Sequence, residues 1–176
     1  MAGMEQIVVI TAVGQDRPGI IAALTEAVYT LGGNLDDATM TRLHGAFAAM
    51  LSVKLPANIT TEDARMALIP LGDRLDLTVS VQAVEESAPE TPSDCLLAVY
   101  GADKPGIVFQ ITQRLARKNV NITDMDTRVA GTPDAPLYVM LLEVHAGEVD
   151  LAEDLDALRT ELGVDIKVQP LDSEAL

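Results

Sequence analysis

The chain has 176 residues, and 12 lysine and arginine against 27 aspartate and glutamate give a formal net charge of −15 at pH 7. Such a field repels DNA and anionic membranes, and no basic patch overrides it, so we expect no direct nucleic-acid binding. The single cysteine, Cys95, excludes an intramolecular disulfide. No segment reaches the roughly 20 apolar residues of a membrane helix, and the N-terminus has no basic leader, so the predicted location is cytoplasmic.

The first half of the chain predicts six elements in the order βαββαβ. They are a strand over 6–13, a helix opening at Pro18, strands over 34–43 and 47–55, a helix capped by Thr60 and Asp63, and a strand over 75–84. Gly32 and Gly33 stop the first helix, and His44-Gly45 indicates a hairpin turn. Pro70 predicts that the second helix kinks or ends early.

The second half predicts the same order. Its elements are a strand over 94–100, a helix over 105–118, strands over 121–130 and 136–144, a helix striped by Leu151, Leu155, Leu158 and Leu162, and a strand over 164–169. Residues 85–93 hold two prolines and no apolar period, so they predict a linker between domains 1–84 and 94–176. The expected fold class is α+β: two ferredoxin-like domains, each a four-stranded antiparallel sheet with two helices on one face.

One heptapeptide occurs twice. Gly14-Gln15-Asp16-Arg17-Pro18-Gly19-Ile20 returns 87 residues later as Gly101-Ala102-Asp103-Lys104-Pro105-Gly106-Ile107, and the match continues without a gap to position 41. A duplicated unit of that size is a domain and not a solenoid repeat.

The repeated loop links the first strand of each copy to the first helix. Gly14 and Gly101 suit a positive φ angle at the end of the strand, and Pro18 and Pro105 suit the first helical position. Asp16, Asp103, Gly19 and Gly106 complete a helix start with reachable N–H groups. Two interpretations remain open: a strand-to-helix turn that binds nothing, and a binding site for a carboxylate or phosphate. The position of Asn34 and Asn121 directly after the helix favours the binding site, because an amide offers a donor and an acceptor to a zwitterion.

The loop, the apolar helix and the asparagine that opens the next strand resemble the ACT domain, a regulatory amino-acid-binding module, over about 5–84 and 94–170. The whole chain is most similar to tandem ACT proteins of the glycine cleavage system transcriptional repressor family. This resemblance implies ligand sites at Gly14, Asp16, Gly19, Ile20 and Asn34, and at Gly101, Asp103, Gly106, Ile107 and Asn121. ACT ligands commonly lie where two modules meet. Since Gly32-Gly33 becomes Asn119-Val120, the two sites need not be equal.

The resemblance further implies a small amino acid as ligand, with glycine and serine as candidates, regulation through a protein partner, and a homodimer. An adaptor with empty pockets is the alternative. An enzyme is not expected, because ACT-containing enzymes carry their catalysis on another domain. His44 and His145 have no metal-ligand spacing, and Asp36-Asp37 and 124–126 are better explained as a polar strand face than as a Mg²⁺ site. No cofactor or metal is expected.

Overall fold

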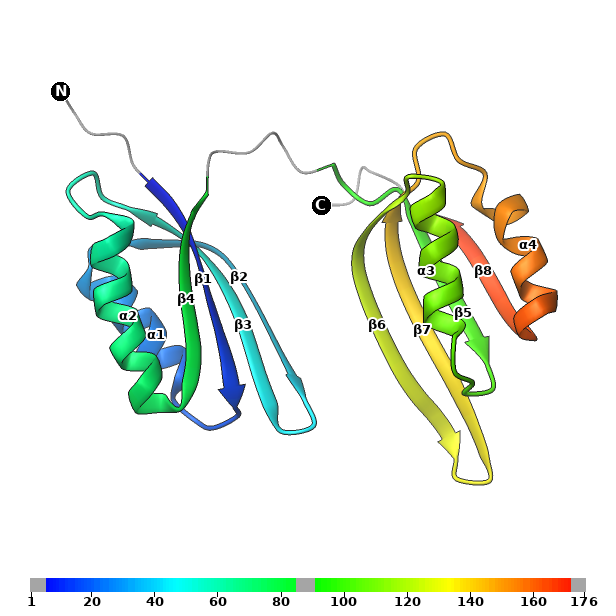
Figure 1. Cartoon of the computed structure of the whole chain (residues 1–176), viewed down its shortest axis with the longest axis horizontal. Coiled ribbons are helices and arrows are strands. Elements are labelled where there is room, and N and C mark those ends of the chain that lie inside the picture. Colours follow the sequence, from blue (N-terminus) through cyan, green and yellow to red (C-terminus); the bar gives the residue numbers. More distant parts are fainter. Residues whose placement is uncertain (1–5, 85–90, 172–176) are drawn as a thin grey trace. The chain divides into compact units, whose positions relative to one another are not determined.

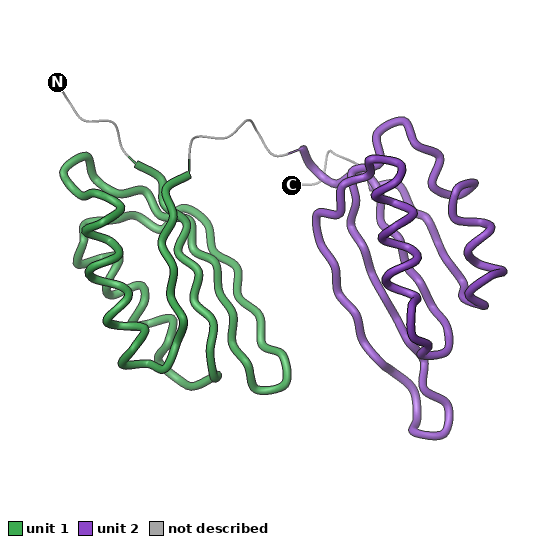
Figure 2. The backbone as a smooth tube through the Cα atoms, viewed as in Figure 1, with its two compact units in different colours: residues 1–88 green, residues 89–176 purple. Residues whose placement is uncertain are grey.

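The structure is a computed structural model that describes residues 6–84 and 91–171. The chain forms two compact units, residues 1–88 and 89–176 (Figure 2), and each is taken by itself below. Residues 85–90 of the predicted linker lie outside the described residues. For the described residues, no helix is long and apolar enough to cross a membrane.

Unit 1 has the predicted βαββαβ order (Figure 1). Its elements are β1 Gln6–Gln15, α1 Ile20–Thr30, β2 Asn34–Leu43, β3 Ala46–Leu55, α2 Thr61–Leu75 and β4 Leu77–Val84. The sheet order is β2-β3-β1-β4, and every neighbouring pair is antiparallel. This is the ferredoxin-like arrangement, with both helices on one face.

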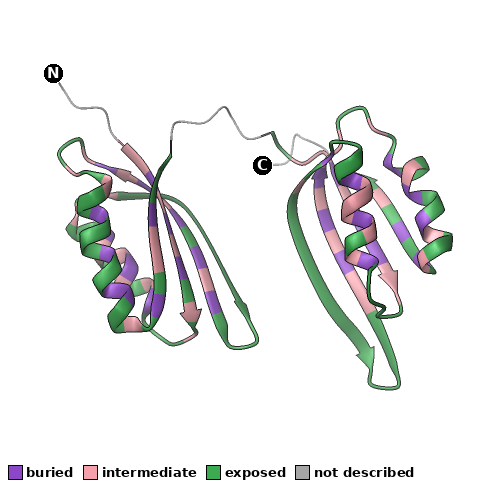
Figure 3. Ribbon diagram, in the orientation of Figure 1, coloured by how far each residue is buried: buried purple, intermediate pink, exposed green. Residues whose placement is uncertain are grey.

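The core of unit 1 is aliphatic and lies between the sheet and the two helices. Alternate residues of β1 and β3 are buried, as expected when one face of a sheet is covered. They meet Leu24 of α1 and Leu68 of α2, both fully buried. β2, at one edge of the sheet, is exposed along its whole length (Figure 3).

Local signals placed most boundaries of unit 1 correctly. In the β2–β3 hairpin, His44 and Gly45 both have positive φ, 48° and 82°, as a type I′ turn requires. Thr60 is the N-cap of α2 and forms a capping box with Asp63. The predicted early end at Pro70 was wrong, because α2 runs on to Leu75 with Pro70 inside it. Leu68 and Leu71, on either side of Pro70, are buried against the sheet, and this packing holds the last turn in place.

Unit 2 repeats the architecture. Its elements are β5 Cys95–Gly101, α3 Ile107–Arg117, β6 Asn121–Thr132, β7 Ala135–His145, α4 Leu151–Leu162 and β8 Val164–Pro170. The sheet order is β6-β7-β5-β8, again antiparallel throughout. Leu151, Leu155 and Leu158 are buried as the leucine stripe predicted, and Cys95 is a small buried strand residue. Burial raises the pKa of the Cys95 thiol.

The duplication extends to backbone detail. The register of β2 on β3 shifts between Leu35 and Asp37, and that of β6 on β7 shifts between Ile122 and Asp124. After the first helix of each unit the chain needs a left-handed residue: Gly32 supplies it in unit 1 with φ 72°, and Asn119 in unit 2 with φ 57°. Asparagine tolerates this conformation better than other non-glycine residues, so the substitution preserves the helix end.

Candidate functional site

Gly14 and Gly101 are needed for close packing, and neither adopts the positive φ angle that the sequence predicted. Neither is among the described glycines with positive φ. A Cβ on Gly14 would lie 2.5 Å from the Asp76 carbonyl oxygen, and one on Gly101 would lie 2.7 Å from Val164 Cγ1. Each glycine therefore lets the last strand of its unit approach the end of the first strand.

Gly19 and Gly106 are the residues that need glycine's freedom. They are the N-caps of α1 and α3, with φ 92° and 96° in the left-handed region. The helices accordingly begin at Ile20 and Ile107, so Pro18 and Pro105 precede the caps and do not occupy the first helical position. Ile20 and Ile107 are each 2% exposed as whole residues and belong to the cores. Their side chains are therefore not available to a ligand.

The two helices that follow the repeated loop lack side-chain caps. Among residues 6–84 and 91–171, no side chain accepts a hydrogen bond at the start of α1 or α3, whereas Thr60 caps α2 and Asp150 caps α4. The expected role of Asp16 and Asp103 as acceptors for these N–H groups is therefore not found. Uncapped N–H groups at a helix start favour an anion. The same feature thus occurs at the same place in both units.

The fourth residue of the loop reaches the second helix of its own unit. Arg17 Nη2 donates to the Arg74 carbonyl oxygen at 3.5 Å, in the last turn of α2. Lys104 Nζ lies 3.6 Å from where a Cβ on Gly163, the C-cap of α4, would stand. A cation at a helix C-terminus is favourable. The repeated basic residue is therefore explained by the fold.

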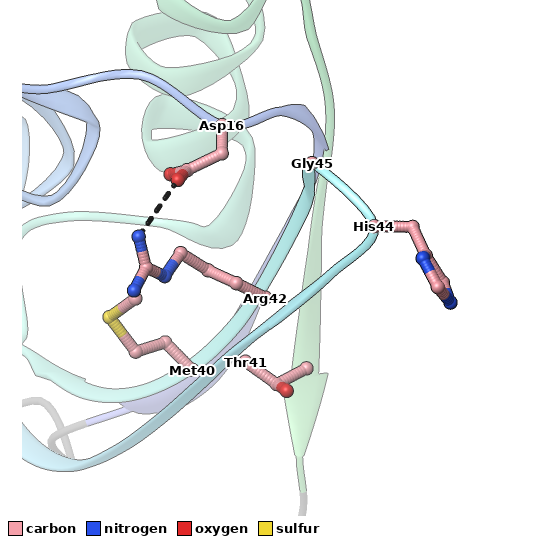
Figure 4. A pocket seen from close by; sticks show the side chains of 6 residues that line it. All are labelled: Asp16, Met40, Thr41, Arg42, His44 and Gly45. Carbon is pink, nitrogen blue, oxygen red and sulfur yellow. Dashed lines mark hydrogen bonds and ion pairs between the residues drawn. The ribbon is translucent and has the colours of Figure 1, made fainter. Parts of the chain in front are cut away.

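In unit 1 the loop borders an open pocket of about 480 Å³, shown in Figure 4. It is lined by Asp16, Met40, Thr41, Arg42, His44 and Gly45. Arg42 Nη1 donates to Asp16 Oδ2 at 3.2 Å, while the His44 ring points away from this pair. The Asp16 backbone N–H donates to the Gly45 carbonyl oxygen at 2.9 Å and holds the loop against the hairpin.

In unit 2 the loop borders a pocket of similar size, about 470 Å³, with a more apolar wall. It is lined by Asp103, Lys104, Pro105, Gly106, Ile107, Val108, Phe109 and Tyr138. Phe109 is 63% exposed, an unusual state for a phenylalanine. The sequence predicted the loop but missed Arg42 in unit 1 and Phe109 and Tyr138 in unit 2. The hairpin turn was a usable signal for Arg42, because it places β2 beside the loop.

Asn34 and Asn121 do not lie near the loop of their own unit. On β3, Gly14 is opposite Phe47 and Asn34 is opposite Lys54, seven residues further along. At roughly 3.3 Å per residue, the two lie about 23 Å apart along the strand. Asn121 is likewise opposite His145, seven residues from Tyr138, the partner of Gly101. Within one unit, a small ligand cannot contact both the loop and the asparagine.

The two histidines lie at the predicted hairpin turn and at the end of a predicted strand. His44 is in the hairpin turn, and His145 Nδ1 lies 3.2 Å from Asp94 Oδ2 at the end of β7. Burial alone would raise the pKa of Asp94, but N–H groups of Ala146 and Gly147 and the nearby His145 outweigh it and lower that pKa. Within 6–84 and 91–171, no group of three or more His, Cys, Asp or Glu side chains is arranged to hold a metal.

Fold and loops together define a duplicated ferredoxin-like module whose glycine-rich turn leaves a helix start uncapped. Models of the ACT domain match residues 6–82 and 96–163, which cover most of the chain. The chain belongs to the ACT-domain family and carries two such domains in tandem.

Over most of its length the chain is similar to a named transcriptional regulator. The glycine cleavage system transcriptional repressor of Escherichia coli is 26% identical over 166 residues, covering 90% of this chain and 86% of the relative. A solved structure of an unknown protein from Galdieria sulphuraria is 26% identical with a TM-score of 0.83, covering 96% of this chain and all of that one. A UPF0237 protein of Methanopyrus kandleri is 39% identical over 79 residues, covering 42% of this chain and 83% of the relative.

Proposed function

We propose that this protein is a non-enzymatic regulator that binds a small amino acid at its ACT loops and thereby changes its interaction with a protein partner. The observation that supports this most is the repeated loop, which borders a pocket in each unit. In both copies the following helix begins after a glycine N-cap that offers no side-chain acceptor to its first N–H groups. The proposed ligand groups are Gly14, Asp16, Gly19, Ile20, Gly101, Asp103, Gly106 and Ile107, with Asn34 and Asn121 as a second contact.

The chemistry of the loop suits the α-carboxylate of an amino acid. Uncapped N–H groups at Ile20 and Ile107 carry the positive end of the helix dipole and would donate to a carboxylate. Asp16 and Asp103 would attract the ammonium group. Pockets of this size, open to solvent, hold small ligands such as glycine or serine without excluding larger ones.

The protein partner we propose is a regulator of transcription of amino-acid metabolism, in the cytoplasm. The support is the similarity to a transcriptional repressor over 90% of the chain, together with a net charge of −15 that opposes direct DNA binding. We also propose a homodimer. A loop and an asparagine lie about 23 Å apart within one unit, so they could contact a common ligand only from different modules, and a second copy of the chain would supply such a module.

Calorimetric titration of the full chain with each of the twenty amino acids tests the ligand. We expect at least one small amino acid to bind, and the double variant Asp16→Asn, Asp103→Asn to weaken it. The double variant Asp73→Asn, Glu161→Gln, at exposed carboxylates on α2 and α4, is the control of equal charge change and should bind as the unchanged protein does. If no amino acid binds, the sensor function is wrong.

The adaptor alternative is separated from the sensor by partner binding. A sensor requires a partner affinity that differs between the ligand-bound and ligand-free states. Affinity capture of partners with and without the amino acid found by calorimetry should therefore give different yields. Equal yields, with the double variant Asn34→Ala, Asn121→Ala also without effect, would instead support a protein-interaction platform.

A further inference from the structure

The pockets of the two units differ at one structurally equivalent position. Arg42 on β2 is opposite Phe47, the partner of Gly14. Val129 on β6 is opposite Tyr138, the partner of Gly101. Arg42 and Val129 therefore occupy the same place relative to the repeated loop, and unit 2 has a valine where unit 1 has a guanidinium.

In unit 1 that guanidinium faces the loop carboxylate. Arg42 and Asp16 are 3.2 Å apart, with side chains 67% and 30% exposed, and both line the pocket (Figure 4). A guanidinium has five N–H donors, and this ion pair, the one hydrogen bond of the Arg42 side chain among the described residues, uses a single donor. Donors thus remain for a second carboxylate beside the first.

Unit 2 has a cation near its loop, but that cation is directed elsewhere. Lys104 borders the pocket, yet its ammonium lies at the C-terminal end of α4, beside Gly163. No ion pair joins Asp103 to a cation among the described residues. Moreover, an ammonium is a point charge without the planar fork that binds a carboxylate through two N–H groups.

We infer that Arg42 is a specificity residue that restricts the pocket of unit 1 to zwitterionic amino acids. The Arg42–Asp16 pair presents a positive and a negative group side by side, and an amino acid lying against it places its carboxylate at Arg42 and its ammonium at Asp16. The pocket of unit 2 lacks this contact and selects instead for an apolar side chain against Phe109 and Tyr138. This inference rests on the proposed function, since it names what each loop pocket recognises.

The test resolves the two sites within the full chain. ¹H–¹⁵N NMR follows the Gly45 amide as a reporter of unit 1 and the Gly106 amide as a reporter of unit 2 during titration with glycine, glycinamide and phenylalanine. We expect glycine to bind unit 1 about tenfold more tightly than glycinamide, because one charged hydrogen-bonded contact is lost. Phenylalanine should bind unit 2 more tightly than glycine does.

Two reciprocal variants isolate the arginine. Arg42→Val should weaken glycine at Gly45 about tenfold and abolish its advantage over glycinamide, with Gly106 unchanged. Val129→Arg, at a position 60% exposed, should tighten glycine at Gly106 several-fold. Arg128→Val is the matched control, because Arg128 is also an exposed strand arginine in an ion pair, with Asp126, outside both pockets. It should leave both sites unchanged.

The possible outcomes distinguish a failure of the Arg42 specificity role from a failure of the proposed amino-acid sensor function. If glycine or another amino acid shifts the loop amides but Arg42→Val leaves the unit 1 affinity within twofold, the specificity role is wrong and the sensor function stands. If no amino acid shifts either reporter, both are wrong. An intact spectrum of unit 1 in Arg42→Val, and in Arg42→Lys as a milder change, shows that a lost affinity is not lost folding.

Discussion

The packing role of Gly14 predicts that Gly14→Ala destabilises unit 1 more than Gly19→Ala does. The added Cβ of Gly14→Ala would lie 2.5 Å from a backbone carbonyl oxygen and 2.7 Å from Leu77 Cδ2. The side chain can move, but the carbonyl moves only with the end of α2 and the start of β4. Overpacking of this kind costs about 1–3 kcal/mol, and a backbone contact places it toward 3. A Cβ on Gly19 would have no atom of the described residues within 4 Å, apart from its chain neighbours, so only the φ penalty of about 1–2 kcal/mol applies.

Urea unfolding measures the difference. With an m-value of about 1 kcal/mol/M for a unit of this size, Gly14→Ala should lower the midpoint of unit 1 by about 2–3 M, and Gly19→Ala by about 1–2 M. Gly101→Ala provides the comparison in unit 2, where the clash is with a side chain, Val164, and should cost less than at Gly14. A free energy of unfolding for Gly14→Ala within 0.5 kcal/mol of the unchanged protein would refute the packing role.

Three further changes follow from particular contacts. Asp94→Asn should destabilise unit 2 at neutral pH. Because the pKa of Asp94 is lowered in the folded state, the difference in melting temperature from the unchanged protein should shrink as the pH falls through that pKa, below about 4. Thermal melts at several pH values measure this difference. Pro70→Ala restores an N–H inside α2 and should stabilise unit 1 by about 1–3 kcal/mol in urea; no gain would show that the helix is already distorted there. His44→Asn, at φ 48°, should raise stability by about 0.5 kcal/mol through the hairpin turn, whereas a loss would mean that the ring has contacts in solution.

The fold could be predicted almost completely because its signals are local. Apolar alternation, the Thr60–Asp63 capping box and the His44-Gly45 turn each act within a few residues, and the strands, helices and hairpins follow from them. The helix end after Pro70 is the exception. The local rule allowed α2 to kink or to end there, and α2 continues to Leu75, with Leu68 and Leu71 buried against the sheet through tertiary packing.

The loop residues were found by their repetition, but what each one does depends on distant neighbours. The contact that makes glycine necessary at position 14 comes from Asp76 and Leu77, more than sixty residues away. Similarly, Arg42 is recognised as a pocket residue only from the register of β2 on β3, which places it opposite Phe47. A motif marks a place in the fold, while the side chains that fill the pocket are brought there by strand pairing.

The separation of Asn34 from the loop follows from the length of the helix between them. An 11-residue helix such as α1 rises about 16 Å, which carries the chain back from the end of β1 to the end where β1 began. The residue just before such a helix and the residue just after it therefore lie at opposite ends of the sheet, although the sequence shows them on either side of one element. Because α3 has the same length, Asn121 and its loop are separated in the same way. Each loop and each asparagine is thus a separate contact, and single variants at Asp16 and Asn34 should affect ligand binding together only when two modules share one ligand.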